Sequence, residues 1–448
     1  MFSRILIANR GEIALRIMRA ARELDIETVA VYSEADRDAA YLDQADHAVC
    51  IGPAPAAQSY LHIPSIIAAA EVANVDAIHP GYGFLAENAH FAEICRSCKI
   101  EFIGPSVEAM GQLGDKVACR KLAASNKVPT FPGSKGKVED EQQARKVANQ
   151  IGYPVIIKAA AGGGGRGMRI AHNDIALRSG MHNAMAEADA AFGDATVYVE
   201  KYLEHARHVE VQILADKHGN VAHLFERDCT MQRRHQKLIE EAPCPVLDPA
   251  TRQKLCESAV RLCKAADYHG AGTVEFLLDP ATGKFYLLEV NTRVQVEHPV
   301  TEQITGVDIV KTMIQVAAGE KLPFSQDDVK LTGHAMECRI NAEDPDRGFI
   351  PQPGVIERFI PPGGFGVRID THAHVGYRIP PNYDSMIAKL IAFAEDREQS
   401  RLRMQRALHE FAIDPIATTI PLHRRLLNNS HFVGNDIDIH FVERLLGS

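Results

Sequence analysis

Two glutamates inside apolar stretches, Glu275 and Glu289, are the residues whose surroundings most clearly predict chemistry in this sequence. The stretches 272–279 and 285–291 are rich in Val, Phe and Leu, and they flank the turn sequence Asp-Pro-Ala-Thr-Gly. Two such runs on either side of a turn predict an antiparallel hairpin. Carboxylates are rarely buried without a partner, so a hairpin that carries two of them is a candidate binding site.

The pairing of the two strands decides what these carboxylates can bind. If Asp279 pairs with Phe285, Glu275 lies directly opposite Glu289, and Asn291 lies on the same face as Glu289. Two facing carboxylates repel each other and require a neutralising partner. Because the set offers only oxygen ligands, we expect Mg²⁺ or Mn²⁺, with a nucleotide's phosphates completing the shell. A pair of ordinary solvent-facing acids is the alternative, which the apolar surroundings disfavour.

The polar segment 291–299 follows the proposed metal ligands directly. If it is extended, it places Arg293, Gln295 and Glu297 on one face, which combines a cation, an amide and a carboxylate. Such a set could hold a small oxyanion and remove its proton. An exposed, salt-bridged strand is the alternative, and the adjacent metal ligands favour the functional interpretation.

A lysine at the end of a short apolar strand, Lys158, precedes the most glycine-dense segment of the chain, Gly162–Gly165 followed by Arg166. Backbone without side chains can approach a polyphosphate closely while Lys158 and Arg166 supply positive charge. The segment does not match the Walker sequence, and four successive glycines favour a mobile lid over a rigid cradle. A solvated flexible loop is the alternative.

A basic cluster over residues 227–237 stands out in a chain of net charge −9. It is either a solvated charge run or part of an ATP site in which His235 and Lys237 face phosphates. The same net charge argues against a nucleic-acid-binding protein, and no apolar run is long enough to suggest a membrane span.

The elements that must position these residues begin at the N-terminus. A strand over residues 4–8, a helix with Ile13, Ile17 and Ala20 on its apolar face, and a strand over residues 28–32 predict a βαβ unit and a parallel sheet. A single glycine in the first turn gives no evidence for NAD. The strand 75–80 and the loop 81–87 form either a ligand-binding edge of the sheet or a structural turn. The sequence favours the two interpretations almost equally.

The 448 residues predict about three domains. The nine scattered cysteines indicate reduced thiols and a cytoplasmic protein, and Cys95 and Cys98 are expected to pack on a helix face rather than bind zinc.

Taken in order, the segments resemble biotin carboxylases of the ATP-grasp superfamily over essentially the whole chain. The motifs that carry the resemblance are residues 7–14, 79–85, the glycine segment, 231–237, 289–301 and 337–345. The resemblance implies an α/β, ATP-grasp fold with an N-terminal Rossmann-like lobe, a small mobile glycine-rich lid domain and a C-terminal α+β domain. The expected limits are 1–114 for the first lobe, 115–130 for a linker, 131–203 for the lid, 204–330 for the catalytic domain and 331–448 for the C-terminal domain.

The resemblance also implies roles for individual residues. The expected ATP contacts are Lys116, Lys158, Gly164, Gly165, Glu200, Lys201, Tyr202, Leu203, His208, Gln232, His235 and Leu277. The expected ligands of two divalent metal ions are Glu275, Glu289 and Asn291. The expected bicarbonate contacts are Lys237, Arg293, Gln295 and Val296, with Glu297 as the base. Biotin is expected at Tyr82 and Arg339, where Arg339 stabilises its enolate.

The activity implied is ATP-dependent carboxylation of biotin through carboxyphosphate, as the first half-reaction of acetyl-CoA carboxylase, which supplies malonyl-CoA for fatty acid synthesis. The sequence lacks an Ala-Met-Lys-Met biotin-attachment site, so we expect a free-standing subunit that acts on a biotin carboxyl carrier protein beside carboxyltransferase subunits. A homodimer is implied by the family alone. Some family members carry a further glycine where this chain has Ala161, so the flexibility of the lid can differ from theirs.

Two rival hypotheses belong to other classes. Another ATP-grasp ligase would share Lys158, Glu275 and Glu289 but gives no reason for Glu297 and Arg339 together. A non-catalytic ATP-binding or scaffold protein would tolerate loss of the base and metal ligands, all of which are present.

Overall fold

The computed structural model describes residues 1–134, 136–138, 140–159, 168–192 and 196–447. The chain forms two compact units, of which the first combines Met1–Val128 with Arg207–Ser448 and the second is Pro129–Ala206. The second unit is therefore one continuous segment between two parts of the first. Among the described residues, no helix is both long and apolar enough to cross a membrane.

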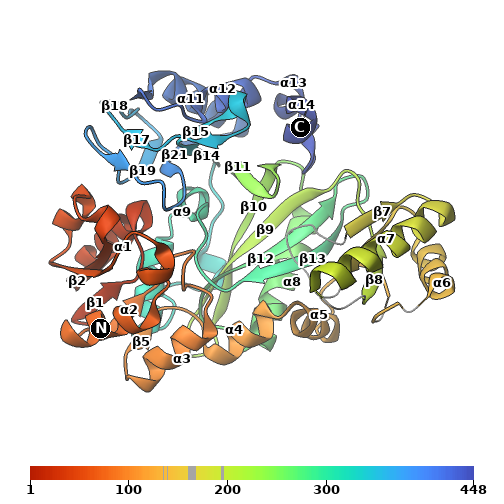
Figure 1. The fold of residues 1–448 in the computed structure, drawn as a ribbon, viewed down its shortest axis with the longest axis horizontal. Helices are drawn as coiled ribbons and strands as arrows, with labels where there is room; N and C mark the ends of the chain where they lie inside the picture. Colours follow the sequence, from red (N-terminus) through yellow and green to blue (C-terminus); the bar gives the residue numbers. More distant parts are fainter. Residues whose placement is uncertain (135, 139, 160–167, 193–195, 448) are drawn as a thin grey trace. The chain divides into compact units, whose positions relative to one another are not determined.

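The first unit begins with a parallel sheet of order β3-β2-β1-β4-β5. Figure 1 labels its strands β1, β2 and β5. Its strands are β1 Arg4–Ile7, β2 Glu27–Ser33, β3 His47–Gly52, β4 Ala77–His79 and β5 Glu101–Phe102. Helix α1 (Gly11–Glu23) buries Ile13, Ile17 and Ala20, the apolar face that the sequence predicts. The predicted βαβ unit and the α/β class are confirmed.

The helices that follow are α2 Ile63–Val72, α3 Ala89–Ser97, α4 Val107–Gly114 and α5 Lys116–Ser125. The predicted linker over 115–130 was wrong as a description of local structure. Asp115 caps α5 by accepting a hydrogen bond from the backbone N–H of Ala118, and Cys119 and Ala123 are buried. Pro129, Pro132 and Gly133 lie beyond the end of this helix.

An antiparallel sheet of eight strands, in the order β13-β12-β9-β10-β11-β14-β21-β19, forms the centre of the first unit. Its strands are β9 Arg207–Ala215, β10 Val221–Arg233, β11 Gln236–Ala242, β12 Gly270–Asp279, β13 Lys284–Asn291, β14 His334–Asn341, β19 Val367–Thr371 and β21 Met386–Ala394. The sheet is continuous across residue 330, where a domain boundary was expected, because β11 pairs with β14.

The helices of this part are α8 Pro249–Ala265, α9 His298–Thr305, α10 Ile309–Ala317, α11 Arg397–Glu410, α12 Ile420–Leu427, α13 Ser430–Val433 and α14 Phe441–Leu446. The short strands are β15 Glu343–Asp344, β16 Ile350–Pro351, β17 Gly354–Val355, β18 Arg358–Ile360, β20 Arg378–Ile379 and β22 Ala412–Asp414. One apolar core runs from α1 through β14 and β21 to α12.

The second unit is a three-stranded antiparallel sheet of order β7-β6-β8 with two helices. Its elements are α6 Glu141–Ile151, β6 Val155–Ala159, β7 Met168–Ala171, α7 Asp174–Phe192 and β8 Val197–Lys201. Val155, Ile157 and Val199 belong to its own small apolar core. The glycine segment, which includes Gly164, Gly165 and Arg166, lies outside the described residues, and so does Ala161.

Candidate functional site

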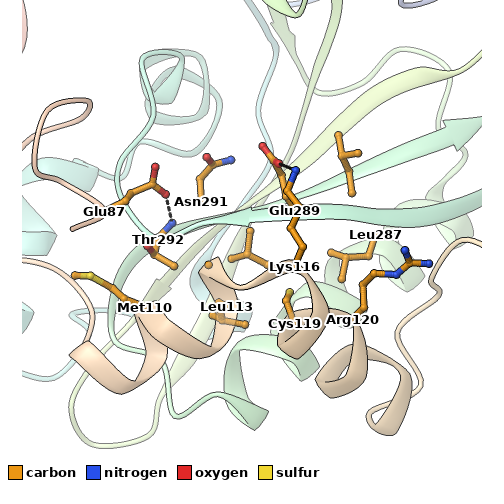
Figure 2. Close-up of a pocket in the computed structure, with 13 residues that line it drawn as sticks. Glu87, Met110, Leu113, Lys116, Cys119, Arg120, Leu287, Glu289, Asn291 and Thr292 are labelled. Carbon is orange, nitrogen blue, oxygen red and sulfur yellow. Dashed lines mark hydrogen bonds and ion pairs between the residues drawn. The ribbon is translucent and has the colours of Figure 1, made fainter. Parts of the chain in front are cut away.

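The β12–β13 hairpin brings the two predicted glutamates together. Glu275 pairs directly with Glu289, and Thr273 pairs with Asn291. Nδ2 of Asn291 donates a hydrogen bond of 2.8 Å to Oε1 of Glu275. The predicted pairing of the two carboxylates is confirmed, and so is the position of Asn291 beside Glu289 (Figure 2).

The predicted register at the turn was wrong by one residue. Asp279 pairs with Lys284, and Phe285 pairs with Leu278. A β-bulge between Glu275 and Phe276 shifts the register by one residue and so restores the Glu275–Glu289 pair. The two departures from the expected ladder, one at the turn and one at the bulge, therefore cancel. Turn signals in a sequence do not locate such a bulge.

The bulge also changes which face of β13 each residue occupies. Phe285, Leu287 and Val290 are all buried in the same apolar core, although the last lies at an odd spacing from the others. Leu288 and Glu289 are both partly exposed on the other face. Simple alternation would have put Glu289 into the core with Leu287. The bulge therefore places the Glu289 carboxylate on the face away from the apolar core.

Cations already surround the buried carboxylate of Glu275. Nε2 of His208 lies 2.9 Å from Oε2 of Glu275, and Nζ of Lys237 lies 3.1 Å from Oε1. Burial alone would raise the pKa of Glu275, but Lys237 and His208 outweigh it and hold that pKa well below its usual range. Burial lowers the pKa of His208, yet Glu275 makes the net shift upward.

Glu289 has a weaker counter-ion. Lys116 on α5 lies 3.8 Å from its carboxylate, and both side chains are partly exposed. Burial and the charge of Glu275 raise the pKa of Glu289. A pocket of about 280 Å³ lies between α4, α5 and β13, and Lys116, Arg120, Glu289 and Asn291 are among the residues that line it (Figure 2).

These residues fit a divalent cation. Two carboxylates and an amide converge from neighbouring strands, and the pKa of Glu289 is raised because Lys116 offsets burial and the charge of Glu275 only in part. In addition, one ligand atom each of His208, Glu210 and Glu275 lies within 4.8 Å of the others. Oxygen-rich sets of this kind are what Mg²⁺ and Mn²⁺ prefer.

Lys237 stands at the centre of a cluster of buried carboxylates. Its Nζ lies 2.6 Å from Glu210, 3.1 Å from Glu275 and 2.6 Å from Glu297. Burial lowers the pKa of Lys237, but the three carboxylates raise it well above its usual value. Lys237 therefore remains a full cation in this position.

Arg227 also contacts the carboxylate cluster. It is fully buried, and it donates to Oε1 of Glu210 at 2.6 Å and to Oε1 of Gln295 at 2.9 Å. Gln295 in turn donates to Oε1 of Glu275 at 2.8 Å. The amide thus links the predicted metal ligand to the arginine.

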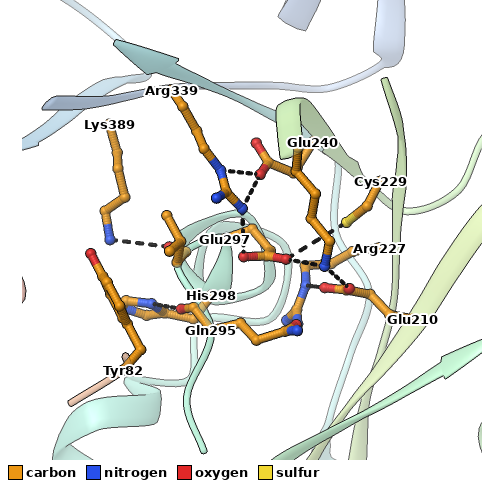
Figure 3. Close-up of polar contacts among 12 residues, drawn as sticks. Tyr82, Glu210, Arg227, Cys229, Glu240, Gln295, Glu297, His298, Arg339 and Lys389 are labelled. Atoms are coloured by element: carbon orange, nitrogen blue, oxygen red, sulfur yellow. Dashed lines mark hydrogen bonds and ion pairs between the residues drawn. The ribbon is translucent and has the colours of Figure 1, made fainter. Parts of the chain in front are cut away.

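The predicted base Glu297 lies at the N-terminus of α9, where the preceding segment has turned. One carboxylate oxygen accepts from Lys237 at 2.6 Å, and the other accepts from Arg339 at 2.9 Å (Figure 3). Burial would raise the pKa of Glu297, but Lys237, Arg339 and Arg227 hold it well below its usual range. Glu297 is therefore ionised and held at both oxygens.

The expectation that residues 291–299 form one extended face was wrong. The segment bends after Asn291 and turns at 296–297 before α9 begins at His298. Gln295 and Glu297 point into the Arg227–Lys237 cluster, whereas Arg293 donates to Glu87 at 2.9 Å and to Oδ1 of Asn291 at 3.2 Å. Pro299, in the first turn of a helix, was the signal for this change of structure.

Tyr82 and Val296 both lie beside Lys389, a residue that the sequence did not indicate as part of the site. Lys389 is fully buried and donates to the backbone oxygen of Val296 at 3.1 Å. It lies 3.2 Å from Glu12 and 5.9 Å from the centre of the Tyr82 ring. The hydroxyl of Tyr82 donates to Glu12.

The loop that carries Tyr82 is held by a structural turn. Nδ2 of Asn9 donates to the backbone oxygens of Pro80 and Tyr82, each at 2.7 Å. Gly81 has φ +64°, and an added Cβ would lie 2.9 Å from that amide nitrogen. The turn needs its glycine for structural reasons, and it also brings Glu87 to Arg293.

The predicted basic cluster is the β10–β11 hairpin. Gln232 is buried and pairs with Lys237, while His235 is exposed at the turn with φ +64°. Leu277 on β12 is half-buried and pairs with both Tyr286 and His208. Of the cluster, the hairpin brings Arg227 and Lys237 to the carboxylates.

The remaining predicted residues belong to the second unit. Nζ of Lys158 lies 2.7 Å from Oε2 of the buried Glu200, and Nζ of Lys201 donates to the backbone oxygens of Gly152 and Tyr153. The backbone of Tyr202 donates to Pro154, and Leu203 follows it. Lys158 and Glu200 are therefore held together across β6 and β8.

Several residues in and beside the cluster were not predicted from the sequence, namely Glu210, Glu240, Lys389 and Glu12. A signal for Glu210 exists, because the strand Val209–Ile213 alternates apolar and polar residues and puts His208, Glu210 and Gln212 on one face. Cys95 and Cys98 belong to no group of candidate metal ligands among the described residues, and all nine cysteines are free thiols.

Three family models match successive parts of the chain. They are "Biotin carboxylase, N-terminal domain" over residues 1–110, "Carbamoyl-phosphate synthase L chain, ATP binding domain" over 115–325 and "Biotin carboxylase C-terminal domain" over 337–444.

Relatives match over nearly their full length. A biotin carboxylase of Nostoc sp. is 55% identical over 444 residues, which are 99% of each chain. A pyruvate carboxylase subunit of Methanothermobacter thermautotrophicus is 52% identical over 99% of this chain and 90% of its own. Among solved structures, the biotin carboxylase domain dimer of Hydrogenobacter thermophilus 2-oxoglutarate carboxylase, in complex with MgADP, ADP and bicarbonate, has a TM-score of 0.90 and 47% identity, covering 99% of this chain and 98% of that one.

Proposed function

This chain belongs to the biotin carboxylase family of ATP-dependent ligases, and from this premise we propose that its buried carboxylate cluster activates bicarbonate for the carboxylation of biotin. Glu297 takes the proton of bicarbonate, and a bicarbonate oxygen then attacks the γ-phosphorus of ATP. ADP leaves, and the product is carboxyphosphate. Carboxyphosphate breaks down to CO₂ and phosphate. The released phosphate takes the N–H proton of the biotin ureido group and leaves the enolate, and the ureido nitrogen then attacks the carbon of CO₂ to give carboxybiotin. Positioning and charge neutralisation carry most of the catalysis.

The observation that carries the proposal is the pair of contacts made by Glu297. Lys237 and Arg339 each hold one of its oxygens, so a base and two cations meet at a single buried point. A carboxylate held in this way has a low pKa and is a weak base. A bicarbonate anion that binds the ammonium of Lys237 weakens the contact between Lys237 and Glu297. The pKa of Glu297 then rises toward the range useful for catalysis.

We assign bicarbonate to Lys237, Arg293, Gln295 and Val296. Gln295 lies between Arg227 and Glu275, and the backbone of Val296 is fixed by Lys389. Arg293 is 21% exposed, and its guanidinium donates hydrogen bonds to Glu87 and Asn291. The same N–H groups could turn toward a bound anion. We assign biotin to Tyr82 and Arg339, with the arginine opposite the enolate oxygen.

Glu275, Glu289 and Asn291 would hold the divalent cations, which neutralise the phosphates of ATP when bound. In the first unit, Lys116, His208, Gln232, His235 and Leu277 are the proposed ATP contacts. In the second unit the proposed contacts are Lys158, Glu200, Lys201, Tyr202 and Leu203, together with Gly164 and Gly165.

We further propose that biotin is presented on a separate biotin carboxyl carrier protein, in the acetyl-CoA carboxylase reaction that leads to malonyl-CoA and fatty acids. The relatives named biotin carboxylase support this context. Carboxyltransferase subunits would complete the assembly, with this chain as a homodimer like the Hydrogenobacter domain. Nine free thiols accord with a cytoplasmic location.

Release of ADP, measured against bicarbonate concentration with and without biotin and Mg²⁺, tests the activity. The proposal predicts bicarbonate dependence, acceleration by biotin and loss of turnover without the metal. Equal turnover in carbonate-depleted buffer would exclude it. The context is tested with purified carrier proteins, because the carrier of acetyl-CoA carboxylase should be carboxylated faster than that of pyruvate carboxylase.

A further inference from the structure

Two buried carboxyl groups, Glu240 and Glu337, lie behind Arg339 and have no part in the mechanism above. Glu240 on β11 pairs directly with Glu337 on β14, and both side chains are fully buried. Directly opposite residues of an antiparallel pair have their Cβ atoms about 5 Å apart on the same face. Arg339 is two residues beyond Glu337 and lies on that face as well.

Arg339 is held between two carboxylates. Its Nε donates to Oε1 of Glu240 at 2.6 Å, and one Nη donates to Oε2 of Glu297 at 2.9 Å (Figure 3). The planar guanidinium is therefore fixed from behind by Glu240 and faces the base in front. Two such contacts on a rigid plane set the direction in which its remaining N–H groups point.

Three carboxyl oxygens of the pair have no hydrogen-bond partner among the described residues: Oε2 of Glu240 and both oxygens of Glu337. The cation nearest along the sheet, Lys389, pairs with Arg339 in the β14–β21 register, but it is engaged by Val296 and Glu12. Burial raises the pKa of Glu337 well above its usual range, and the charge of Glu240 adds to that rise. Burial also raises the pKa of Glu240, although the charge of Arg339 lowers it.

We propose that Glu240 is a positioning residue for Arg339, and that Glu337 stays protonated opposite it, so that this pair carries one negative charge. Two full charges at this separation, with one guanidinium shared with Glu297, would leave an uncompensated buried anion. The role of Glu240 rests on the proposed function, whereas the protonation of Glu337 does not.

The arrangement matters when Glu297 gains a proton. Neutral Glu297 attracts Arg339 less, so that contact weakens at the step in which the arginine must stay in place for biotin. Glu240 keeps its charge and its hydrogen bond to Nε, and it holds the guanidinium through the change. Misplacement of a catalytic group by about 1 Å costs on the order of 100-fold in rate.

Glu240→Gln tests the positioning role, because it keeps the shape and removes the charge. We expect kcat for carboxybiotin formation to fall about 10- to 100-fold, with KM for ATP changed less than about twofold. Glu240→Asp, which keeps the charge, should recover part of the loss.

Glu226→Gln is the matched control, since Glu226 is fully buried, accepts from Arg252 at 2.8 Å and also has one unpartnered oxygen. It should retain the wild-type kcat. Wild-type kcat in Glu240→Gln, or equal losses in the Gln and Asp variants, would overturn the positioning role. A wild-type enzyme without bicarbonate-dependent ADP release would instead refute the proposed function.

Infrared spectroscopy tests the proton on Glu337 without any turnover. At neutral pH the wild-type spectrum should contain a carbonyl band of a protonated carboxyl group that is missing from Glu337→Gln. Identical spectra of the two folded proteins in this region would overturn the assignment.

Discussion

The ammonium nitrogen of Lys237, whose side chain is 12% exposed, lies 2.6 Å from the carboxylate of the buried Glu297. This contact holds the pKa of Glu297 low. In the proposed mechanism, Glu297 would become an effective base when bicarbonate draws Lys237 away, which would link proton removal to substrate binding.

Glu297→Gln should abolish bicarbonate-dependent ADP release while ATP binding stays within about twofold of wild type. The amide keeps the shape of the side chain but accepts no proton at neutral pH. Stopped-flow or steady-state ADP assays measure the first effect, and nucleotide titration by calorimetry measures the second. Wild-type rates would remove Glu297 from the role of base.

Lys237→Met should lower the free energy of unfolding by about 3–5 kcal/mol at neutral pH, because three carboxylates lose a shared buried cation. Lys237 depresses the pKa of Glu275 and Glu297. Their contribution is therefore present above the unfolded-state pKa of about 4.3 and is lost as pH falls through the lower folded-state values.

Urea unfolding at several pH values measures this effect. The difference between wild type and Lys237→Met should shrink in acid. Lys217→Met is the control, since Lys217 pairs with Glu101 at a part-exposed position and should cost at most about 1 kcal/mol. Equal losses in both variants would contradict the prediction.

Arg339→Lys should reduce carboxybiotin formation by about 100-fold, because an ammonium cannot contact Glu240, Glu297 and an enolate together. ADP release without biotin should fall much less, since Lys237 still holds Glu297 and the biotin enolate forms only after phosphoryl transfer. Arg397→Lys changes another arginine held by a buried glutamate, Glu241, and should leave the ratio of the two rates unchanged. Loss of both rates in equal measure would count against a role specific to biotin.

Glu289→Gln should raise the Mg²⁺ concentration needed for half-maximal activity by at least about 10-fold, because one anionic ligand is lost. A Mg²⁺ titration of ADP release measures the shift. Glu101→Gln removes a part-exposed carboxylate elsewhere in the same unit and should leave the titration unchanged. An unchanged titration for Glu289→Gln would exclude Glu289 as a ligand.

Glu337→Gln should change how stability depends on pH. Because the folded-state pKa of Glu337 is raised, its contribution is full below the unfolded-state pKa of about 4.3 and falls as pH rises toward the folded-state value, by up to about 1.4 kcal/mol per pH unit. The wild type should therefore lose stability relative to the variant between about pH 5 and pH 7. A constant difference in chemical unfolding across this range would contradict a protonated Glu337.

The sequence carried enough information to predict the N-terminal βαβ unit and the hairpin, because both depend on local periodicity and turn residues. It could not predict the bulge beside Glu275, since no local signal marks an extra residue in a strand. The turn at 296–297 was missed although Pro299 marks the helix that follows.

Long-range contacts account for the residues that sequence reasoning missed. Glu240 and Glu337 become neighbours because β11 pairs with β14, which are almost a hundred positions apart in the chain. Lys389 reaches Val296 from yet another strand. Spacing within one segment contains no information about such pairings, so the support of Arg339 and of Val296 appears in the fold alone.

Leu288 occupies the bulge of β13, where a residue has no opposite partner. Its removal would restore plain alternation, with Leu287 and Val290 still on the apolar side and Glu289 and Asn291 still on the other. The hairpin can therefore gain or lose a residue here during evolution while the two acids remain face to face. The number of residues that separates these glutamates is consequently a poor criterion for deciding whether a distant relative has kept its catalytic apparatus.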